Sequence, residues 1–295
     1  MTILRSLLFV PGNRPNMLQK ALGFNPDVFM PDLEDSVPAD EKANARAVAA
    51  SFLAKLSNTG SLVIPRVNSL DSGLLEQDLA AIITPKIYGL SIGKVETVQE
   101  IADICRLIEP LEQNAGLATG RLKLIPWIES AKAIVNAYEI CSSSKRIIAV
   151  AFGAEDFTND MGIERTDDDS EIAYARSAVC IAARAADVVA LDTPYFGFRD
   201  TDGLQRDANT AKKQGFKGKF AIHPAQIDII NATFAPSPQE VEHAKRVLAA
   251  FEAAEHRGRG STSLDGKVID VPVVKRARAI LAMADSVANQ VPSKR

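Results

Sequence analysis

The sequence has little of what several classes of protein depend on. It contains three cysteines in 295 residues, Cys105, Cys141 and Cys180, and their wide separation suits no zinc site. Each falls in a helical pattern, so we expect reduced, packed thiols, which are typical of a cytoplasmic protein. No apolar run reaches the roughly 18 residues that a membrane span requires. The first residues enter a strand pattern without the features of a signal peptide, so we expect a cytoplasmic location and no membrane partner.

The charge of the chain and the lack of one glycine motif argue against binding of nucleic acid and against a nucleotide-binding sheet. The formal net charge is -3, which gives no electrostatic reason to bind nucleic acid. An anionic substrate would therefore have to be bound by local groups of arginine and lysine. No strand pattern is followed by a Gly-x-Gly-x-x-Gly turn, which a doubly wound nucleotide-binding sheet normally contains.

Strand and helix patterns alternate along most of the chain. Short apolar runs separated by amphipathic helices are typical of a buried parallel sheet. Eight such runs, with helical patterns between them, fit the length and order of a (β/α)8 TIM barrel, and an open doubly wound sheet is the structural alternative. The expected strands are residues 4–10, 28–33, 62–67, 82–87, 122–128, 146–152, 188–191 and 219–222.

The end of the chain does not continue this alternation. A proline-rich break at residues 235–238 is followed by a helical pattern over 239–255 and a flexible basic loop over 257–263. Asp265-Gly266 predicts a turn, and residues 273–287 predict a last helix. We therefore expect a catalytic barrel domain, residues 1–236, and a C-terminal helical extension, residues 237–295, that packs outside the barrel or reaches a neighbouring subunit.

Two carboxylates end consecutive strands in the centre of the chain. Glu129 follows the fifth expected strand, and Asp156 follows the sixth after Gly153, which permits a close approach. Ligands of α/β folds bind at the carboxyl ends of strands, so both side chains should lie at one end of the barrel. They could bind Mg²⁺, with water and substrate oxygens completing the coordination. Alternatively, either residue could only cap the helix that follows.

The other expected strands also end in polar residues. We expect a site at this end of the barrel because all of these side chains would point into the same space there. Each has a structural alternative, such as a salt bridge for Arg66. We interpret His223 as a core histidine rather than a residue near the substrate, and the acidic run 167–169 as a helix start rather than a second metal site. The other strand-end residues are Arg14, Asp32, Glu34, Asp35, Asn68, Lys86, Glu155 and Asp192.

Several motifs, in order along nearly the whole chain, resemble the citrate lyase β-subunit family. That family includes malyl-CoA and citramalyl-CoA lyases and belongs to the HpcH/HpaI aldolase group. One small departure is Ser36, where alanine is commoner. The motifs are RSLLFVPG (5–12), DLEDSV (32–37), RVN (66–68), PK (85–86), IES (128–130), GAED (153–156), IHPAQ (222–226) and GKVID (266–270).

The resemblance implies a TIM barrel, a homotrimer or hexamer, and one Mg²⁺ ion. It implies that a catalytic aspartate comes from the tail of a neighbouring subunit. The motif matches Asp270, and the nearby Asp265 is the alternative. The implied roles are metal binding for Glu129 and Asp156, substrate binding for Arg66, Gly153 and Ala154, and catalysis for Glu34, Asp35 and Asp270.

The function that these observations predict is cleavage of a carbon–carbon bond. We expect a Mg²⁺-dependent lyase that converts a 3-hydroxyacyl thioester, such as citramalyl-CoA, malyl-CoA or a citryl thioester, into an acyl thioester and a keto acid. The alternatives are a malyl-CoA thioesterase or a malate-synthase-like enzyme, and a non-catalytic subunit that binds a carrier protein. Four cations could bind the phosphates of coenzyme A or of an acyl-carrier protein: Arg14, Lys20, Lys42 and Arg46. Alternatively, these four side chains form a solvated helix face without a ligand.

Overall fold

The computed structural model describes residues 2–166 and 168–290. Contacts divide the chain into two compact units. One contains residues 4–231, and the other contains residues from Ala232 onward together with Thr2 and Ile3. The division therefore falls between Asn231 and Ala232, whereas the sequence predicted a boundary after residue 236. Each unit is described by itself.

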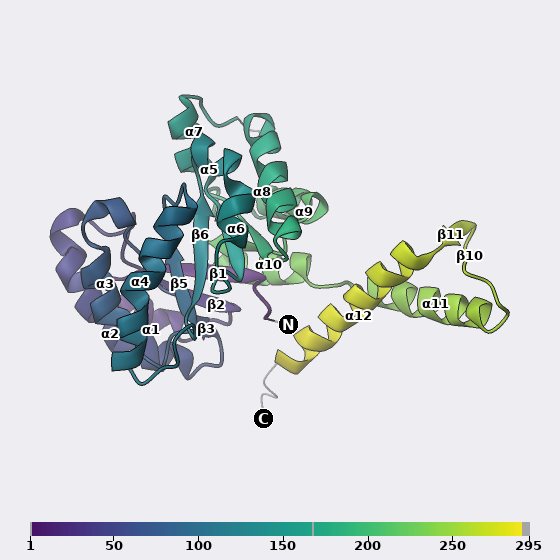
Figure 1. The fold of residues 1–295 in the computed structure, drawn as a ribbon, viewed down its shortest axis with the longest axis horizontal. Coiled ribbons are helices and arrows are strands. Elements are labelled where there is room, and N and C mark those ends of the chain that lie inside the picture. Colours follow the sequence, from purple (N-terminus) through teal and green to yellow (C-terminus); the bar gives the residue numbers. More distant parts are fainter. Residues whose placement is uncertain (1, 167, 291–295) are drawn as a thin grey trace. The chain divides into compact units, whose positions relative to one another are not determined.

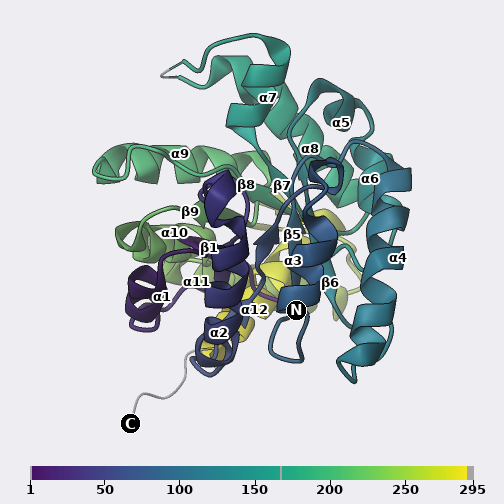
Figure 2. The same cartoon turned by 90° about the vertical axis from the view of Figure 1, so that its left-hand side faces the viewer.

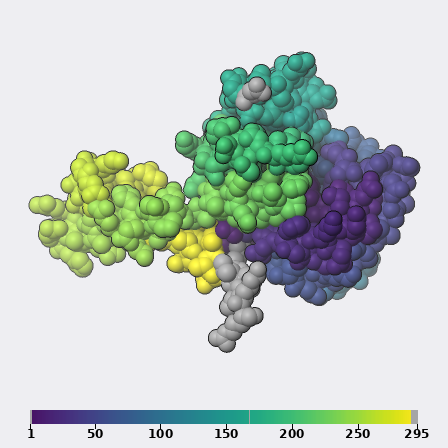
Figure 3. Space-filling model, turned by 180° about the vertical axis from the view of Figure 1, so that it is seen from behind, coloured from purple at the N-terminus to yellow at the C-terminus, as the bar shows by residue number. Residues whose placement is uncertain are grey.

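Residues 4–231 form a closed parallel barrel surrounded by helices, which confirms the predicted TIM barrel (Figures 1 and 2). Pairing of β1 with both β2 and β9 closes the sheet, so the first and last barrel segments meet on one face (Figure 3). The third strand is divided into β3 and β4 at Pro65, which has no N–H for the ladder. The strands are β1 Ser6–Pro11, β2 Val28–Asp32, β3 Leu62–Val63, β4 Arg66–Val67, β5 Gly89–Ile92, β6 Lys123–Ile128, β7 Ala149–Phe152, β8 Val189–Asp192 and β9 Gly218–Ala221.

Helices alternate with these strands and cover their outer faces (Figure 2). The start of α4 shows why the sequence folds locally in this way. The side chain of Thr97 accepts a hydrogen bond from Glu100 N, and the Glu100 carboxylate accepts one from Thr97 N, which is a capping box. The helices are α1 Pro15–Ala21, α2 Lys42–Ser57, α3 Leu75–Ile82, α4 Val98–Asn114, α5 Ala131–Val135, α6 Ala137–Ser142, α7 Ala154–Met161, α8 Ala173–Ala185, α9 Thr201–Gln214 and α10 Ile227–Phe234.

Three predictions of secondary structure were wrong in detail. The strand expected at residues 82–87 is the end of α3 followed by a turn, because Ile82 belongs to the buried face of the helix. The true strand is β5, whose four residues are all buried. The helical pattern predicted between the fifth and sixth strands is divided at Asn136 into α5 and α6, and helix α10 follows the last strand, where no helix was predicted.

The barrel interior is filled by large apolar side chains. The rings of Phe9, Trp127 and Phe220 stack on one another, with centroids 4.4 Å apart for Trp127 and Phe220 and 5.4 Å apart for Phe9 and Phe220. Aliphatic residues such as Leu7 and Ile125 are fully buried around them. The barrel is therefore a packed core, and its chemistry is confined to the ends of the strands.

Two groups of buried charges tie the helices to this core. Arg176 of α8 and Lys219 of β9 both contact Asp192 and Asp207. Elsewhere, the guanidinium of Arg146 donates to both carboxylate oxygens of Glu112 on α4, at 2.9 and 2.8 Å. The Glu112 carboxylate also accepts hydrogen bonds from the backbone N–H groups of Gly120 and Leu122. Its two oxygen atoms therefore have the hydrogen-bond donors that a buried carboxylate requires.

The second unit is a pair of helices joined by a short hairpin. Helix α11 (Pro238–Glu255) leads to strands β10 (Thr262–Leu264) and β11 (Lys267–Ile269), and helix α12 (Val271–Gln290) follows. The predicted Asp265-Gly266 turn joins the two strands, and both of its residues have positive φ. The helices pack through an apolar cluster of their own: Ala244, Val247, Phe251, Ile269, Val274 and Ala277.

All three cysteines are free, and Cys141 and Cys180 are buried, as the sequence predicted. No helix in the described part of the chain has the length and apolar character needed to cross a membrane.

The Glu112–Arg146 pair should contribute strongly to stability. Glu112→Gln keeps the size of the side chain but leaves the buried Arg146 guanidinium with only the half-exposed Glu109 carboxylate, 3.8 Å away, as its counter-charge. Breaking such a buried pair costs about 3–5 kcal/mol, so we expect the free energy of unfolding in urea to fall by about 3 kcal/mol. Arg106→Ala is the control, because Arg106 pairs with Asp103 on the exposed face of the same helix, where pairs contribute less than about 1 kcal/mol. Equal losses in the two variants would contradict this account.

Candidate active site at the carboxyl ends of the strands

Arg66 is the centre of the polar residues at the carboxyl ends of the strands. It lies opposite Asp32 on the neighbouring strand, β2. Its Nε and Nη2 atoms donate to the two carboxylate oxygens of Asp32, each at 2.7 Å. This bidentate geometry is the strong form of an arginine–carboxylate pair, and Asp32 is fully buried. The guanidinium therefore has a fixed position.

The other contacts of Arg66 bring in two more carboxylates and two rings. Its Nη1 atom lies 3.1 Å from Glu34 Oε2 and 2.9 Å from Asp35 Oδ2. The guanidinium carbon lies over the Phe9 ring, 4.6 Å from its centroid, and 5.8 Å from that of Trp127. Glu34 is buried, whereas half of the Asp35 side chain is exposed. Asp35 is thus the partner that can leave Arg66 most easily.

Two glycines lie directly against the carboxylates of Glu129 and Glu34. A Cβ atom on Gly153 would lie 2.3 Å from Glu129 Oε2, so only glycine fits beside this carboxylate. A Cβ atom on Gly93 would lie 2.7 Å from Glu34 Oε1 and 3.1 Å from Glu129 Oε1. The close approach predicted for Gly153 is therefore present, and Gly93 provides a second one.

These buried carboxylates are short of positive charge. Burial, with the nearby charges of Asp156 and Glu34, raises the pKa of Glu129 to about 8. Burial also raises the pKa of Glu34 to about 7 despite Arg66, and burial and Asp35 raise the pKa of Asp156. Glu34 Oε1 is buried and has no hydrogen-bond partner among the described residues. A cation beside Glu129 and Asp156 would satisfy these groups.

The donor set fits a hard divalent cation that keeps part of its water. Only carboxylate oxygens are offered, which suits Mg²⁺. Among residues 2–166 and 168–290, no three side chains of His, Cys, Asp or Glu converge closely enough to hold a metal by themselves. Glu129 and Asp156 therefore remain the predicted pair of metal carboxylates, for which water and substrate would be the remaining ligands.

A cavity of about 320 Å³ opens beside these two carboxylates. Glu129, Ser130, Asp156 and Asn159 line it, together with Lys94. Its size suits a small organic acid. Gly153 and Ala154, which the resemblance assigned to substrate binding, are not among its lining residues. The Ala154 N–H donates to Thr193 Oγ1, at 3.3 Å.

The sequence reasoning missed Lys94. Because the fourth strand was placed too early, Lys86 was expected at this end of the barrel. Lys86 precedes β5 and is exposed at the opposite end of the strand, whereas Lys94 follows β5. A correct strand at residues 89–92 would have pointed to Gly93-Lys94 as the strand-end pair.

Two of the four cations assigned to phosphate binding, both on α2, bind other groups of the protein instead. Lys42 Nζ donates to the carbonyl oxygens of Leu33 and Glu34 and to Asn68 Oδ1, at 2.7–2.8 Å. Arg46 pairs with the buried Asp78, at 2.7 Å. These contacts fix the loop after β2 and correct the expectation for both residues. Arg14 and Lys20 are exposed.

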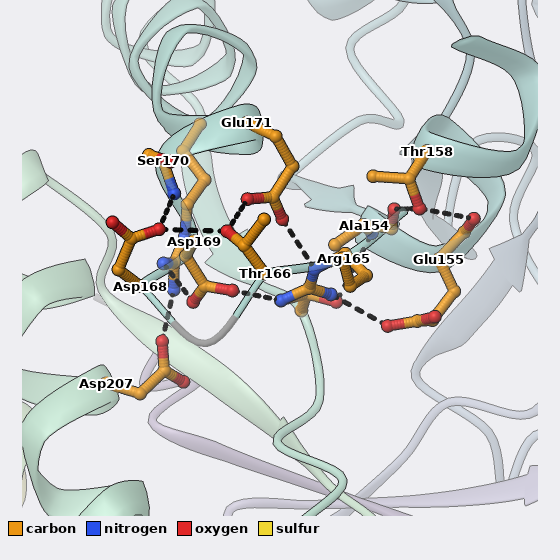
Figure 4. A network of polar contacts seen from close by, with 12 residues as sticks. Ala154, Glu155, Thr158, Arg165, Thr166, Asp168, Asp169, Ser170, Glu171 and Asp207 are labelled. Carbon is orange, nitrogen blue, oxygen red and sulfur yellow. Dashed lines mark hydrogen bonds and ion pairs between the residues drawn. The ribbon is translucent and has the colours of Figure 1, made fainter. Parts of the chain in front are cut away.

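The acidic run after α7 belongs to a network that starts the next helix (Figure 4). Arg165 lies at its centre and contacts Glu155, Asp169 and Glu171. Asp168 Oδ1 accepts a hydrogen bond from Ser170 N at the start of the helical segment. The interpretation as a helix start is thus confirmed for the described residues, and Asp167 lies outside them.

Two other strand-end residues are structural. Asp192 is fully buried between Arg176 and Lys219. His223 is exposed, its Nδ1 accepts a hydrogen bond from Ala225 N, and its ring lies near Phe198. The interpretation of His223 as a core histidine was therefore wrong, because the side chain caps a short turn instead.

Residues 89–93 also match the Gly-x-Ser-x-Gly pattern of serine hydrolases. The structure excludes that role for Ser91, which is fully buried within β5. Its hydroxyl accepts a hydrogen bond from Trp127 Nε1 at 2.7 Å and donates to the carbonyl oxygen of Ile125. It is therefore not a nucleophile on an exposed turn.

The two candidate aspartates of the tail have different surroundings. Asp265 forms an ion pair with Arg246 of α11, at 2.7 Å. Asp270 is exposed at the start of α12, where its Oδ1 accepts a hydrogen bond from Val273 N. Asp270 is not in an ion pair with any described residue, so its charge is free to act outside the unit.

Comparisons with known proteins agree with this geometry. The family model HpcH/HpaI aldolase/citrate lyase matches residues 5–224. The chain is 37% identical over 282 residues to a citrate lyase subunit beta of Leuconostoc mesenteroides subsp. cremoris, covering 96% of this chain and 93% of that one. It is 32% identical over 293 residues to a mitochondrial citramalyl-CoA lyase of Rattus norvegicus, covering 96% and 86%.

A solved structure shows the same fold. The CitE protein of Mycobacterium tuberculosis, in complex with magnesium, acetoacetate and coenzyme A, superposes with a TM-score of 0.77 at 26% identity. The match covers 95% of this chain and 97% of that chain. Together with the family model and the two relatives, this establishes that the chain belongs to the HpcH/HpaI aldolase/citrate lyase family.

Proposed function

We propose that the chain is a Mg²⁺-dependent carbon–carbon lyase that cleaves a 3-hydroxyacyl thioester into an acyl thioester and a keto acid. The observation that carries the proposal is the convergence of the buried carboxylates of Glu34 and Glu129, together with Asp156, beside a fixed arginine and a cavity of small-acid size. The relatives act on, or are bound to, molecules of this chemistry: citrate, citramalyl-CoA and, in one solved structure, acetoacetate with magnesium and coenzyme A.

Glu129 and Asp156 would hold the metal ion. A bound Mg²⁺ supplies Lewis acidity toward the oxygen atoms of a keto acid. The Lys94 N–H donates to Glu129 Oε1 at 2.6 Å and so leaves Oε2 free on the side of Gly153. Glu34, whose Oε1 has no partner among the described residues, would accept a hydrogen bond from a water at this site.

Arg66 would bind the carboxylate of the keto acid. Asp32 already occupies its Nε–Nη2 edge, so the edge formed by Nη1 and Nη2 is the one that can face substrate. Asp35 is the exposed partner on Nη1 and would be displaced. Such an exchange of one carboxylate for another keeps the guanidinium paired at all times.

Carbon–carbon cleavage requires two proton transfers. The hydroxyl group of the substrate loses its proton as the carbon–carbon bond breaks and the ketone forms, and the acyl thioester enolate gains a proton on carbon. Glu34, Asp35 and Asp270 are the carboxylates that we assign to these transfers. Asp270 would come from the tail of a neighbouring subunit in a closed trimer or hexamer, so that each barrel receives one foreign carboxylate.

The thioester arm would pass the β1–α1 loop. Arg14 lies in this loop and Lys20 in the last turn of α1. Both are exposed and would meet the phosphates of coenzyme A or of an acyl-carrier protein. Lys42 and Arg46 are left out of this assignment because other groups of the protein already bind them. Lys42 donates to backbone carbonyl oxygens, and Arg46 pairs with Asp78.

The function is tested with the isolated chain and a panel of citramalyl-, malyl- and citryl-CoA. We expect pyruvate, glyoxylate or oxaloacetate together with an acyl-CoA, and only when Mg²⁺ is present. A thioesterase would instead release free thiol and the hydroxy acid, and condensation in the reverse direction would be seen with acyl-CoA and keto acid. No product from any thioester, with or without Mg²⁺, would favour a non-catalytic subunit.

Loss of either proposed metal ligand should remove Mg²⁺-dependent turnover. Glu129→Gln and Asp156→Asn each replace one charged oxygen ligand, and even partners outside the ligand shell typically contribute roughly 10–100-fold. We expect at least that loss in turnover and in Mg²⁺ affinity measured by calorimetry. Glu155→Gln is the matched control, since Glu155 turns away toward Arg165 (Figure 4). Normal Mg²⁺ affinity in Glu129→Gln and Asp156→Asn would refute the assignment.

The tail is tested by mixing inactive variants. Asp270→Asn should form a normal oligomer, bind Mg²⁺ and keto acid, and lose turnover. Mixing it with Glu129→Gln subunits should restore part of the activity, because some sites would combine an intact barrel with an intact tail. Asp265→Asn is the comparison and should keep its turnover, because Asp265 is paired with Arg246. No recovery despite subunit exchange shown by mass spectrometry would mean that the tail does not serve a neighbour.

A further inference from the structure

Lys94 has an uncommon backbone conformation at the edge of the carboxylate group. Its φ angle is +58°, which places a side chain other than glycine in the left-handed region at an energetic cost. This conformation turns the Lys94 N–H toward Glu129 Oε1, at 2.6 Å, and leaves the side chain at the cavity. The backbone contact needs no lysine, because glycine or asparagine could provide the same N–H more easily.

The ammonium group of Lys94 is not paired. Among the described residues, no carboxylate lies within ion-pair distance of Lys94 Nζ, and the side chain is exposed. Arg66, by contrast, contacts three carboxylates. Burial lowers the pKa of Lys94, but the surrounding carboxylates raise it by more, and these belong to Glu34, Asp35, Asp156 and Glu129. Among the described residues, Lys94 is thus a cation beside the cavity that is available to meet a ligand.

The charges at the site show why a free cation is needed. Five carboxylates surround Arg66 and Lys94, and four more, Asp71, Glu96, Glu100 and Asp160, line the cavity. Even with Lys42 nearby, one Mg²⁺ ion and these cations leave a residual negative charge. A keto acid is itself an anion and would be repelled. Removing Lys94 would make the metal-loaded site more negative and would oppose binding of the acid still further. The five carboxylates around Arg66 and Lys94 are Asp32, Glu34, Asp35, Glu129 and Asp156.

We propose that Lys94 is a binding residue whose ammonium group attracts the anionic keto acid into the metal-loaded cavity. This inference rests on the proposed function and adds a residue that the family motifs in the sequence did not identify. It assigns Arg66 to holding the acid in place and Lys94 to offsetting its charge. Because the two ligands have opposite charge, Lys94 should affect Mg²⁺ and keto acid in opposite directions.

The test is the variant Lys94→Asn, which removes the charge but tolerates the left-handed backbone and keeps the N–H. By calorimetry, we expect Mg²⁺ to bind roughly threefold more tightly and pyruvate, in saturating Mg²⁺, to bind roughly tenfold more weakly. Lys94→Gly should behave in the same way, and Lys94→Arg should retain the affinity for pyruvate.

Lys86→Asn is the matched control, because it removes the same charge at the opposite end of β5 and should leave both affinities unchanged. Wild-type affinity for pyruvate in Lys94→Asn would overturn the inference, while Mg²⁺-dependent binding to the wild type would keep the proposed function intact. Weaker binding of both Mg²⁺ and pyruvate would also overturn it, because Lys94 would then act only by positioning Glu129. If the wild type binds no pyruvate, glyoxylate or oxaloacetate with Mg²⁺, the proposed function itself is wrong.

Discussion

The pairing of Arg66 with Asp32 is the interaction on which the site depends. Both residues lie on adjacent barrel strands, and the fully buried Asp32 takes one whole edge of the guanidinium. The Phe9 ring covers one face of the guanidinium, and the remaining donors hold Glu34 and Asp35. A lysine could not replace this arginine, because a single ammonium cannot hold a carboxylate by two parallel bonds. The loop after β2 is therefore fixed by the side chain of a different strand.

A high density of negative charge is the cost of this arrangement. Carboxylates that are buried close together destabilise the folded protein unless a cation compensates them. Gly93 and Gly153 make the crowding possible, since a Cβ atom at either position would collide with Glu129 or Glu34. The well-packed aromatic interior of the barrel and buried ion pairs such as Glu112–Arg146 offset the free energy that this crowding costs. The site thus resembles other functional sites, where local energy is given up and the scaffold compensates.

The chain also divides its tasks between two units. The barrel holds the candidate metal carboxylates, the arginine and the cavity, all on adjacent strand ends. The tail has its own apolar cluster and carries the exposed Asp270 at the start of a helix. Because this carboxylate is exposed, it is accessible to another protein surface. Its use in a neighbouring site is a proposal that the mixing experiment addresses.

The sequence by itself determined the barrel, the extension with its turn at Asp265-Gly266, and the strand-end positions of Glu129 and Asp156. These features depend on local periodicity and on residues that follow strands directly, so they can be predicted without knowing the fold. The tertiary structure alone decided which charges are free. Arg66 and Asp32 are 34 positions apart in the sequence, and Lys42 and Asn68 are 26 apart, so no local pattern reveals these pairs. Long-range contacts also engage Lys42 and Arg46 of α2, because a buried charge must find its partner wherever the fold brings one near. Among the described residues, they leave Lys94 without an ion-pair partner at the cavity.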